Sequence, residues 1–263
     1  MPKNYGPGGG FDGNPVRYFG SSSRGYAQNI LDSSTVQNAP LGAMREFLDG
    51  SQFRYALAAG AISAGQVCAT DVLTASNAGP GLVPTDNSCT AAAVGATQVI
   101  VTAGALASVA ADTFAGAKLI TEDDAGEGYA YPIISNTAAD SNAVTLSLDP
   151  AFPIKVALTT ATDVAIIQNP CFEVVPATAA TDCICVGVAP TAVSDNEYFW
   201  MQTKGNSNVL CDGTPTFGDN LTLSDGETGA VQLKDAETEQ LVGTALQTGA
   251  SGAQVGIRLN LGW

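Results

Sequence analysis

Carboxylates are the side chains of this chain best suited to chemistry, because the sequence contains no histidine. Without histidine the commonest general base is missing, and neither a Ser-His-Asp triad nor a Cys-His pair can form within the chain. The densest acidic group is Glu122, Asp123 and Asp124 with Glu127, and it encloses a glycine typical of a turn. Carboxylates in a solvated turn keep ordinary pKa values, so we expect a hairpin tip here rather than a glycosidase pair.

Two metal sites can be considered, one built from carboxylates and one from cysteines. The acidic group above, or Asp219 with Asp225 and Glu227, offers oxygen ligands for calcium, but no twelve-residue EF-hand loop is present. A four-thiolate zinc site could be formed by Cys171, Cys183, Cys185 and Cys211. The paired C-x-x-C knuckles typical of such sites are missing. No phosphate-binding loop of the G-x-x-x-x-G-K-[ST] kind occurs. We therefore expect no metal, no cofactor and no enzyme, and we expect the cysteines to be small buried apolar residues.

Charge is unevenly distributed along the 263 residues, whose net charge is -15. Residues 1–54 hold five Lys or Arg and four Asp or Glu, whereas residues 55–263 hold five and twenty-one. An acidic body repels phosphate backbones, so a nucleic-acid partner is not expected. Only 13% of the residues are charged and 45% are apolar, which indicates a lightly charged surface that protein partners can cover.

Neither a signal peptide nor a membrane segment is expected. Residues 1–3 lead into Gly and Asn without an apolar region, and no window approaches eighteen continuous apolar residues. We expect synthesis in a cytoplasm with reduced cysteines, although their even number also suits disulfide bridges in an oxidising medium. The alternation that ends at Trp263 is similar to an outer-membrane barrel strand, but the missing export signal argues against that class.

The first 45 residues are expected to form an extended arm, and residues 46–263 a β-rich body. Glycine, proline and serine clusters break every helix or strand period as far as Pro40. Between them lie five rings and two arginines: Tyr5, Phe11, Arg17, Tyr18, Phe19, Arg24 and Tyr26. Disordered tails are normally poor in aromatic residues, so these seven are candidate contacts of an arm that orders on another surface. A flexible terminus without such a role is the alternative interpretation.

Two hairpins are predicted from turn residues between apolar runs. Asp49-Gly50 lies between two hydrophobic flanks, Phe47-Leu48 and Phe53-Arg54-Tyr55, which is the strongest short hairpin signal. Residues 198–203 form an aromatic strand suited to the centre of a sheet. Residues 204–206 then predict a turn and residues 209–210 a return strand.

Further strands are predicted where β-branched residues alternate, at residues 99–101, 118–120, 129–134, 144–148, 164–167, 172–175 and 184–188. In the last of these, Cys183 and Cys185 are expected on one face, with Ile184, Val186 and Val188 on the other. Helix signals are limited to residues 27–32 and 235–242.

The cleanest alternation closes the chain. The apolar set, expected on one face and tied into the core, is Val255, Ile257, Leu259, Leu261 and Trp263. Many short strands with regular turn signals predict an all-β protein, with an antiparallel β-barrel or sandwich body and an extended, largely irregular N-terminal arm.

From Leu41 onward, the order of these segments resembles the head decoration, or capsid cement, proteins of tailed bacteriophages. The segments are Leu41-Gly42 leading into residues 47–55, then residues 61–67, Gly128-Tyr129, residues 169–174, residues 187–190, residues 198–205 and residues 242–246. Each is a strand or turn in Ala- and Gly-rich sequence, and the series in order carries the resemblance. It covers about residues 41–263, whereas residues 1–40 match nothing in the family.

The resemblance implies a structural virion protein, assembled in the host cytoplasm and located on the capsid exterior. Such a protein binds the major capsid protein, commonly as a homotrimer, and stabilises contacts between neighbouring capsid subunits. Members of the family carry no catalytic residues. Two other interpretations remain: a phage or bacterial surface adhesin that binds glycans, and a tail-tube or baseplate subunit. A polysaccharide depolymerase comes last, because no carboxylate pair in a groove is evident.

Overall fold

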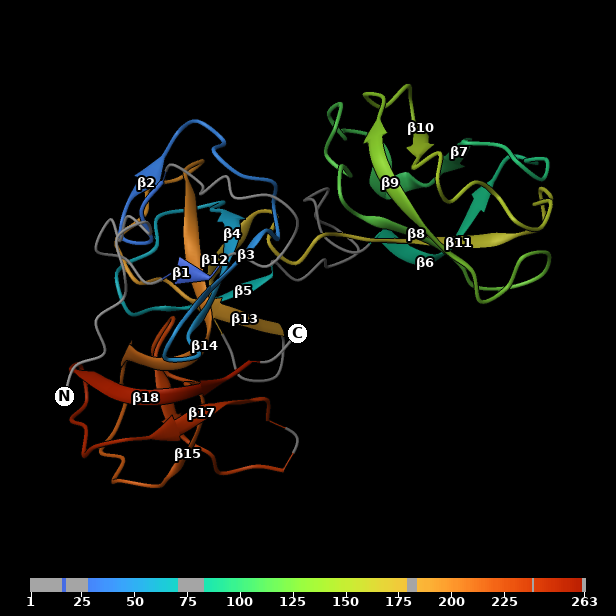
Figure 1. Cartoon of the computed structure of the whole chain (residues 1–263). Coiled ribbons are helices and arrows are strands. Elements are labelled where there is room, and N and C mark those ends of the chain that lie inside the picture. Colours follow the sequence, from blue (N-terminus) through green and yellow to red (C-terminus); the bar gives the residue numbers. More distant parts are fainter. Residues whose placement is uncertain (1–15, 18–27, 71–82, 179–183, 238, 262–263) are drawn as a thin grey trace.

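The computed structural model describes residues 16–17, 28–70, 83–178, 184–237 and 239–261. Within them the chain is all-β, as the sequence predicts, and it forms one large antiparallel sheet and one closed barrel. Figure 1 shows the barrel, in green to yellow, standing apart from the sheet. The described residues form no helix long and apolar enough to cross a membrane.

The large sheet contains twelve strands, eight of which follow the order β1-β3-β4-β14-β18-β17-β15-β16. The remaining four pair beside this path: β2 with β14, β12 with β5, and β13 with both β5 and β14. Their bounds are β1 Val16–Arg17, β2 Ser33–Ser34, β3 Met44–Phe47, β4 Gln52–Leu57, β5 Val67–Thr70, β12 Val174–Pro176, β13 Ile184–Val188, β14 Tyr198–Leu210, β15 Asn220–Leu223, β16 Val231–Leu233, β17 Leu241–Ala245 and β18 Gln254–Asn260.

The central strand of this sheet is β14, which confirms the position predicted for the aromatic run. Its first half pairs with β4 and its second half with β18. Phe199 and Met201 point into one core, whereas Trp200 points into a second core on the other face. Because successive side chains alternate across a strand, both faces of β14 are buried here, as its continuous apolar sequence requires.

The turn predicted at residues 204–206 is wrong, because β14 runs on without reversing to Leu210. Its register against β4 shifts between Gln202 and Lys204, and Gly205 has a φ of +94°. A Cβ at Gly205 would lie 2.5 Å from the Oγ of Ser51. The glycine therefore allows a bulge and a close approach of β4, which a single sequence does not distinguish from a turn.

The six-stranded barrel closes in the order β10-β7-β6-β11-β8-β9. Its strands are β6 Val83–Cys89, β7 Gln98–Thr102, β8 Lys118–Thr121, β9 Ala130–Asn136, β10 Ala143–Leu148 and β11 Asp163–Ile167, with one 3-10 turn, η1, at Gly104–Leu106. The barrel has its own core, whose buried residues all fall between Cys89 and Ile166.

The barrel is an insertion into the large sheet. It lies in the chain between β5 and β12, and these two strands pair with each other, with Thr70 opposite Val174. The chain thus leaves the sheet and returns to it at neighbouring positions. Near the return point, Gln168 donates a hydrogen bond to the carbonyl of Thr113 (2.7 Å) and Asn169 donates one to the carbonyl of Leu41 (3.4 Å).

We predict that residues 83–167 fold without the rest of the chain. Their strands pair only among themselves in the described structure, and a closed barrel leaves no sheet edge to cover. The expected result is a β-type circular dichroism spectrum and a cooperative thermal transition for this fragment. A random-coil spectrum would show that the barrel depends on the sheet.

Most of the other predicted strands are confirmed. The hairpin across Asp49-Gly50 is formed by β3 and β4. The predicted segments are covered by β7, β8, β10, β11 and β13, and β9 begins one residue after the predicted start, at Ala130. The strand expected at residues 172–175 is shorter and later, at Val174–Pro176. In the last strand, Val255, Ile257 and Leu259 are buried and Leu261 beyond it is buried as well, whereas Trp263 lies outside the described residues.

Two local predictions are wrong. The described parts of the predicted helices, residues 28–32, 235–237 and 239–240, form turns and irregular backbone, and residues 241–242 begin β17. In β13 the register shifts between Cys185 and Gly187. This bulge places Cys185 in one core with Val188 and leaves Val186 in another, so the expected two-face alternation fails. Cys183 lies outside the described residues.

Candidate functional site

The arm-bearing end of the sheet is the first candidate site. Of the seven predicted contact residues the structure describes Arg17, which lies in β1 at the register position opposite Glu46 of β3. The other six lie outside the described residues; they are Tyr5, Phe11, Tyr18, Phe19, Arg24 and Tyr26. The arm therefore meets the body at the outer edge of β3.

Residues 28–45, which the sequence groups with the arm, pack on the sheet through the buried side chain of Gln28. Its Nε2 donates hydrogen bonds to the carbonyls of Asp32 and Tyr198, both at 2.8 Å. Its Oε1 accepts hydrogen bonds from the Tyr55 hydroxyl (2.7 Å) and from Nδ2 of Asn38 (3.1 Å). One amide thus joins the segment to both β4 and β14. A lone glutamine in an irregular segment gives no sequence signal for such a role.

Five rings from β3, β4 and β14 form the surface under this segment, here called the aromatic platform: Phe47, Phe53, Tyr55, Tyr198 and Trp200. Tyr55 lies 5.0 Å from Trp200 and 5.9 Å from Tyr198 between ring centroids. The guanidinium of the buried Arg45 lies 4.1 Å from the Trp200 ring centroid and donates a hydrogen bond to the carbonyl of Gln28 (2.6 Å). A cation over an indole face is favourable when both are desolvated.

The protonation state of Tyr55 matches its role as a donor. Burial raises the pKa of its hydroxyl, although a hydrogen bond from the backbone N–H of Asn38 acts in the opposite direction. The hydroxyl therefore stays protonated at neutral pH and donates to Gln28. The platform packs the β3–β4 hairpin against β14.

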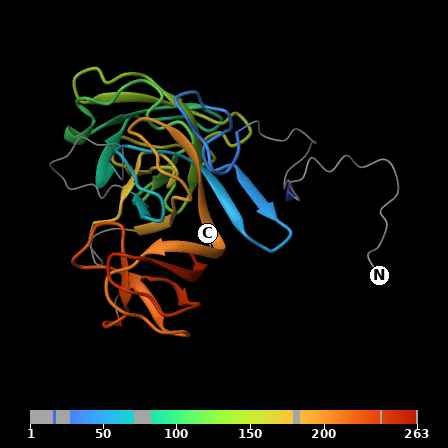
Figure 2. The same cartoon turned by 90° about the vertical axis from the view of Figure 1, so that its left-hand side faces the viewer.

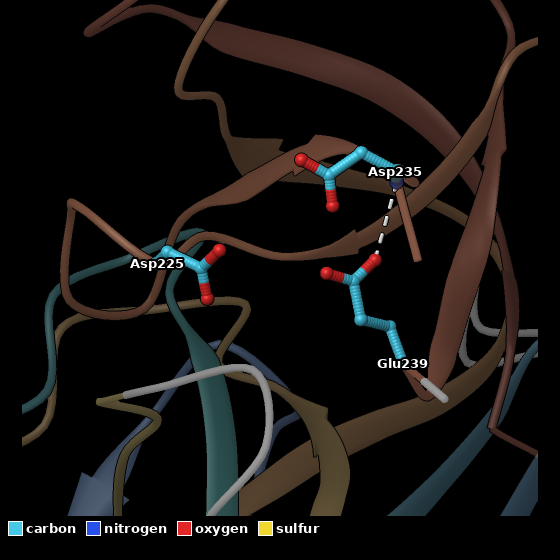
Figure 3. Close-up of side chains that lie close together, drawn as sticks. All are labelled: Asp225, Asp235 and Glu239. Atoms are coloured by element: carbon cyan, nitrogen blue, oxygen red, sulfur yellow. Dashed lines mark hydrogen bonds between the residues drawn. The ribbon is translucent and has the colours of Figure 1, made fainter. Parts of the chain in front are cut away.

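A second candidate site is an acidic cluster of Asp225, Asp235 and Glu239, shown in Figure 3. One carboxylate oxygen of each lies within 4.8 Å of the others. Glu239 is buried, and its Oε2 accepts hydrogen bonds from the backbone N–H groups of Asp235 and Ala236, both at 3.2 Å. Asp225 is held from the other side by Gln232, whose Nε2 donates to its carboxylate (3.3 Å).

The two closest carboxyl groups of the cluster titrate differently. A hydrogen bond with Glu239, followed by the negative charge of Glu239, raises the pKa of Asp235. Burial alone would raise the pKa of Glu239, but the backbone N–H of Ala236 and the Asp235 side chain outweigh it and lower the pKa. A proton entering this pair is therefore held first by Asp235.

This cluster differs from the calcium ligands considered from the sequence. Asp225 takes part, but Asp219 instead accepts hydrogen bonds from the N–H and hydroxyl of Thr216, at 2.7 and 3.0 Å. Glu227 is not among the three residues. Three carboxylates suit a hard cation, yet exposed acidic groups often occur without one, so the cluster does not by itself assign a metal function.

We predict that Asp235→Asn raises the melting temperature at neutral pH. Asp235 has a raised pKa, so the favourable protonated form is lost as pH rises through that value, and both carboxylates then repel each other. Asparagine keeps a donor toward Glu239 at every pH. The gain should shrink as pH falls into the acid range, and thermal scans at several pH values measure it. A gain that is equal at all pH values would contradict the assignment.

The other described sequence candidates lie in a loop of the barrel and in the buried cores. Asp123, Asp124 and Glu127 lie exposed in the loop between β8 and β9, as predicted for a hairpin tip. Five of the six cysteines are described, and all five are free thiols and buried; they are Cys68, Cys89, Cys171, Cys185 and Cys211. Burial raises the pKa of Cys68 and of Cys171 to about 12, so these thiols are poor nucleophiles.

Comparison with known proteins adds no relative. The chain matches no family model, no curated protein and no solved structure.

Proposed function

We propose that this chain is a capsid decoration protein of a tailed bacteriophage, which binds the outer surface of the head and stabilises contacts between major capsid subunits. The observation that carries the proposal is the strand β1. It pairs Val16–Arg17, two residues from within the aromatic, Arg-containing segment, with β3 at the edge of an all-β body. A protein that attaches by an arm and a sheet edge suits a role in assembly.

The resembling segments support the same view by their location. Residues 41–55 form the β3–β4 hairpin, residues 198–205 lie in β14 and residues 242–246 run through β17. Gly128-Tyr129 is the one resembling segment that falls within the barrel. The likeness to cement proteins therefore belongs to the sheet, and we assign capsid binding to the sheet and its arm.

The proposal includes no catalysis. The chain has no histidine, and the described cysteines are buried free thiols. A non-enzymatic role as an adaptor needs only contact area, repeated over many copies. Modest interfaces between neighbouring subunits then add up through avidity, and self-association, most simply as a homotrimer, multiplies them further.

The direct test uses heads purified without this protein, to which the purified chain is added back. We expect binding at a saturating number of copies that scales with the number of capsid subunits, and a higher temperature for release of the packaged DNA. Binding of only a few copies at the tail would favour an adhesin or baseplate subunit. Absence of binding to heads at any concentration would refute the proposal.

A further inference from the structure

The outer edge of β3 accepts an extended strand. β3 pairs with β4 on its inner side and with β1 on its outer side, both antiparallel. The register places Val16 opposite Phe47 and Arg17 opposite Glu46. β1 is therefore an added strand at one end of the sheet, the arrangement in which a sheet edge recognises a peptide through backbone hydrogen bonds.

The receiving edge is preformed. The tip of the hairpin is closed by hydrogen bonds from the N–H of Phe47 to the carbonyl of Ser51 (2.9 Å) and from the N–H of Gly50 to the carbonyl of Phe47 (3.0 Å). Next to the tip, the Phe47 and Phe53 rings of the two strands meet edge to face, with 5.3 Å between their centroids. Figure 2 shows this hairpin, in blue, projecting from the rest of the sheet. A strand whose hairpin is already held by such contacts loses little entropy when another strand docks on it.

The opposite end of the sheet, at β16, does not present a comparable edge for an added strand. There β16 is covered by the segment that follows β14, because Cys211 bridges Val231 in parallel. The N–H of Asp212 also donates a 2.7 Å hydrogen bond to the carbonyl of Val231. Of the two ends of the strand path, the β3 end is the one at which the arm is seen to add a strand.

The pairing of β1 with β3 of the same chain is expected to be weak. β1 is two residues long, and ten residues, 18–27, connect it to the next described residue, Gln28. Two residues contribute few backbone hydrogen bonds, whereas closing the connection costs conformational entropy. An identical segment from a second copy can make the same pairing.

We propose that β1 is exchanged between copies, so that Val16–Arg17 of one chain adds to the β3 edge of a second chain. This deepens the proposed function, on which it rests, by naming the surface through which decorating subunits hold one another. Where copies are crowded together, as on a capsid, the high effective concentration of neighbouring arms favours the exchanged form.

Cysteine trapping in the full-length chain, at a protein concentration high enough to crowd the arms as a capsid would, tests the exchange. One chain carries Arg17→Cys and a second, isotopically labelled chain carries Glu46→Cys; both carry Cys183→Ser. Directly opposite positions of an antiparallel pair lie within disulfide reach, so the mixed disulfide should form about tenfold more than in the control. The control pairs Arg17→Cys with Gln232→Cys, a half-buried position in β16 at the far end of the sheet.

Each outcome decides the proposal. Mixed disulfide well above the Gln232 control, read by mass spectrometry of the two labelled chains, supports exchange. A yield of mixed disulfide no higher than that of the control overturns the proposal. The Arg17→Cys and Glu46→Cys double variant is then informative, since an internal disulfide would show that β1 stays on its own chain. The assay contains no heads, so its failure is separate from failure of the head-binding test.

Discussion

Replacement of Trp200 by alanine should reduce the free energy of unfolding by about 3–5 kcal/mol, the usual cost of removing a buried Trp or Phe side chain. The indole is fully buried at the centre of the aromatic platform, 5.0 Å from the Tyr55 ring. Its loss leaves a cavity and removes the face on which the buried Arg45 guanidinium lies. Chemical denaturation followed by circular dichroism measures the change.

A matched control is Phe217→Ala, because this ring is 76% exposed. It should change stability by no more than about 0.5 kcal/mol, as surface substitutions usually do. A cost below about 1 kcal/mol for Trp200→Ala would contradict the position given to β14. Because small domains are stable by only about 5–15 kcal/mol, the expected effect is a large part of the total.

Deletion of residues 1–27 should abolish attachment to heads while leaving a folded body. The cut falls before Gln28 because the Gln28 side chain holds residues 28–45 on β4 and β14. The deletion removes all seven predicted contact residues. Losing two hot-spot side chains at about 2 kcal/mol each would weaken binding by more than about 100-fold. Co-sedimentation with heads measures binding, and circular dichroism checks the fold.

A control chain keeps the length of the arm and carries serine at the seven contact positions. It should bind as poorly as the deleted chain if rings and guanidiniums make the contacts. Head binding of the deleted chain at the level of the full chain would refute the role of the arm.

The local elements were predictable because they depend on local signals. Turn chemistry at Asp49-Gly50 and alternation in Val255, Ile257 and Leu259 act over a few residues, and the structure has the hairpin and the buried face. The same local logic fails at Gly205 and Cys185, where a bulge replaces a turn or shifts the alternation. A bulge is decided by what the neighbouring strand presents, here Ser51 against Gly205.

The arrangement of the strands was beyond prediction because it rests on pairings between distant residues. Thr70 and Val174 are opposite each other, yet the whole barrel lies between them in the chain. The candidate sites depend on the same long-range contacts. Gln28 meets Tyr198 across the sheet, and the acidic cluster joins Asp225 to residues that follow β16. Residue type alone marks none of these as partners.

A cryo-electron microscopy reconstruction of phage particles assembled with this chain tests the proposed decoration role most directly. We expect density for the all-β body at repeated positions over the outer surface of the capsid, with the arm in contact with neighbouring subunits. Density confined to the tail, or a capsid surface without it, would contradict that role.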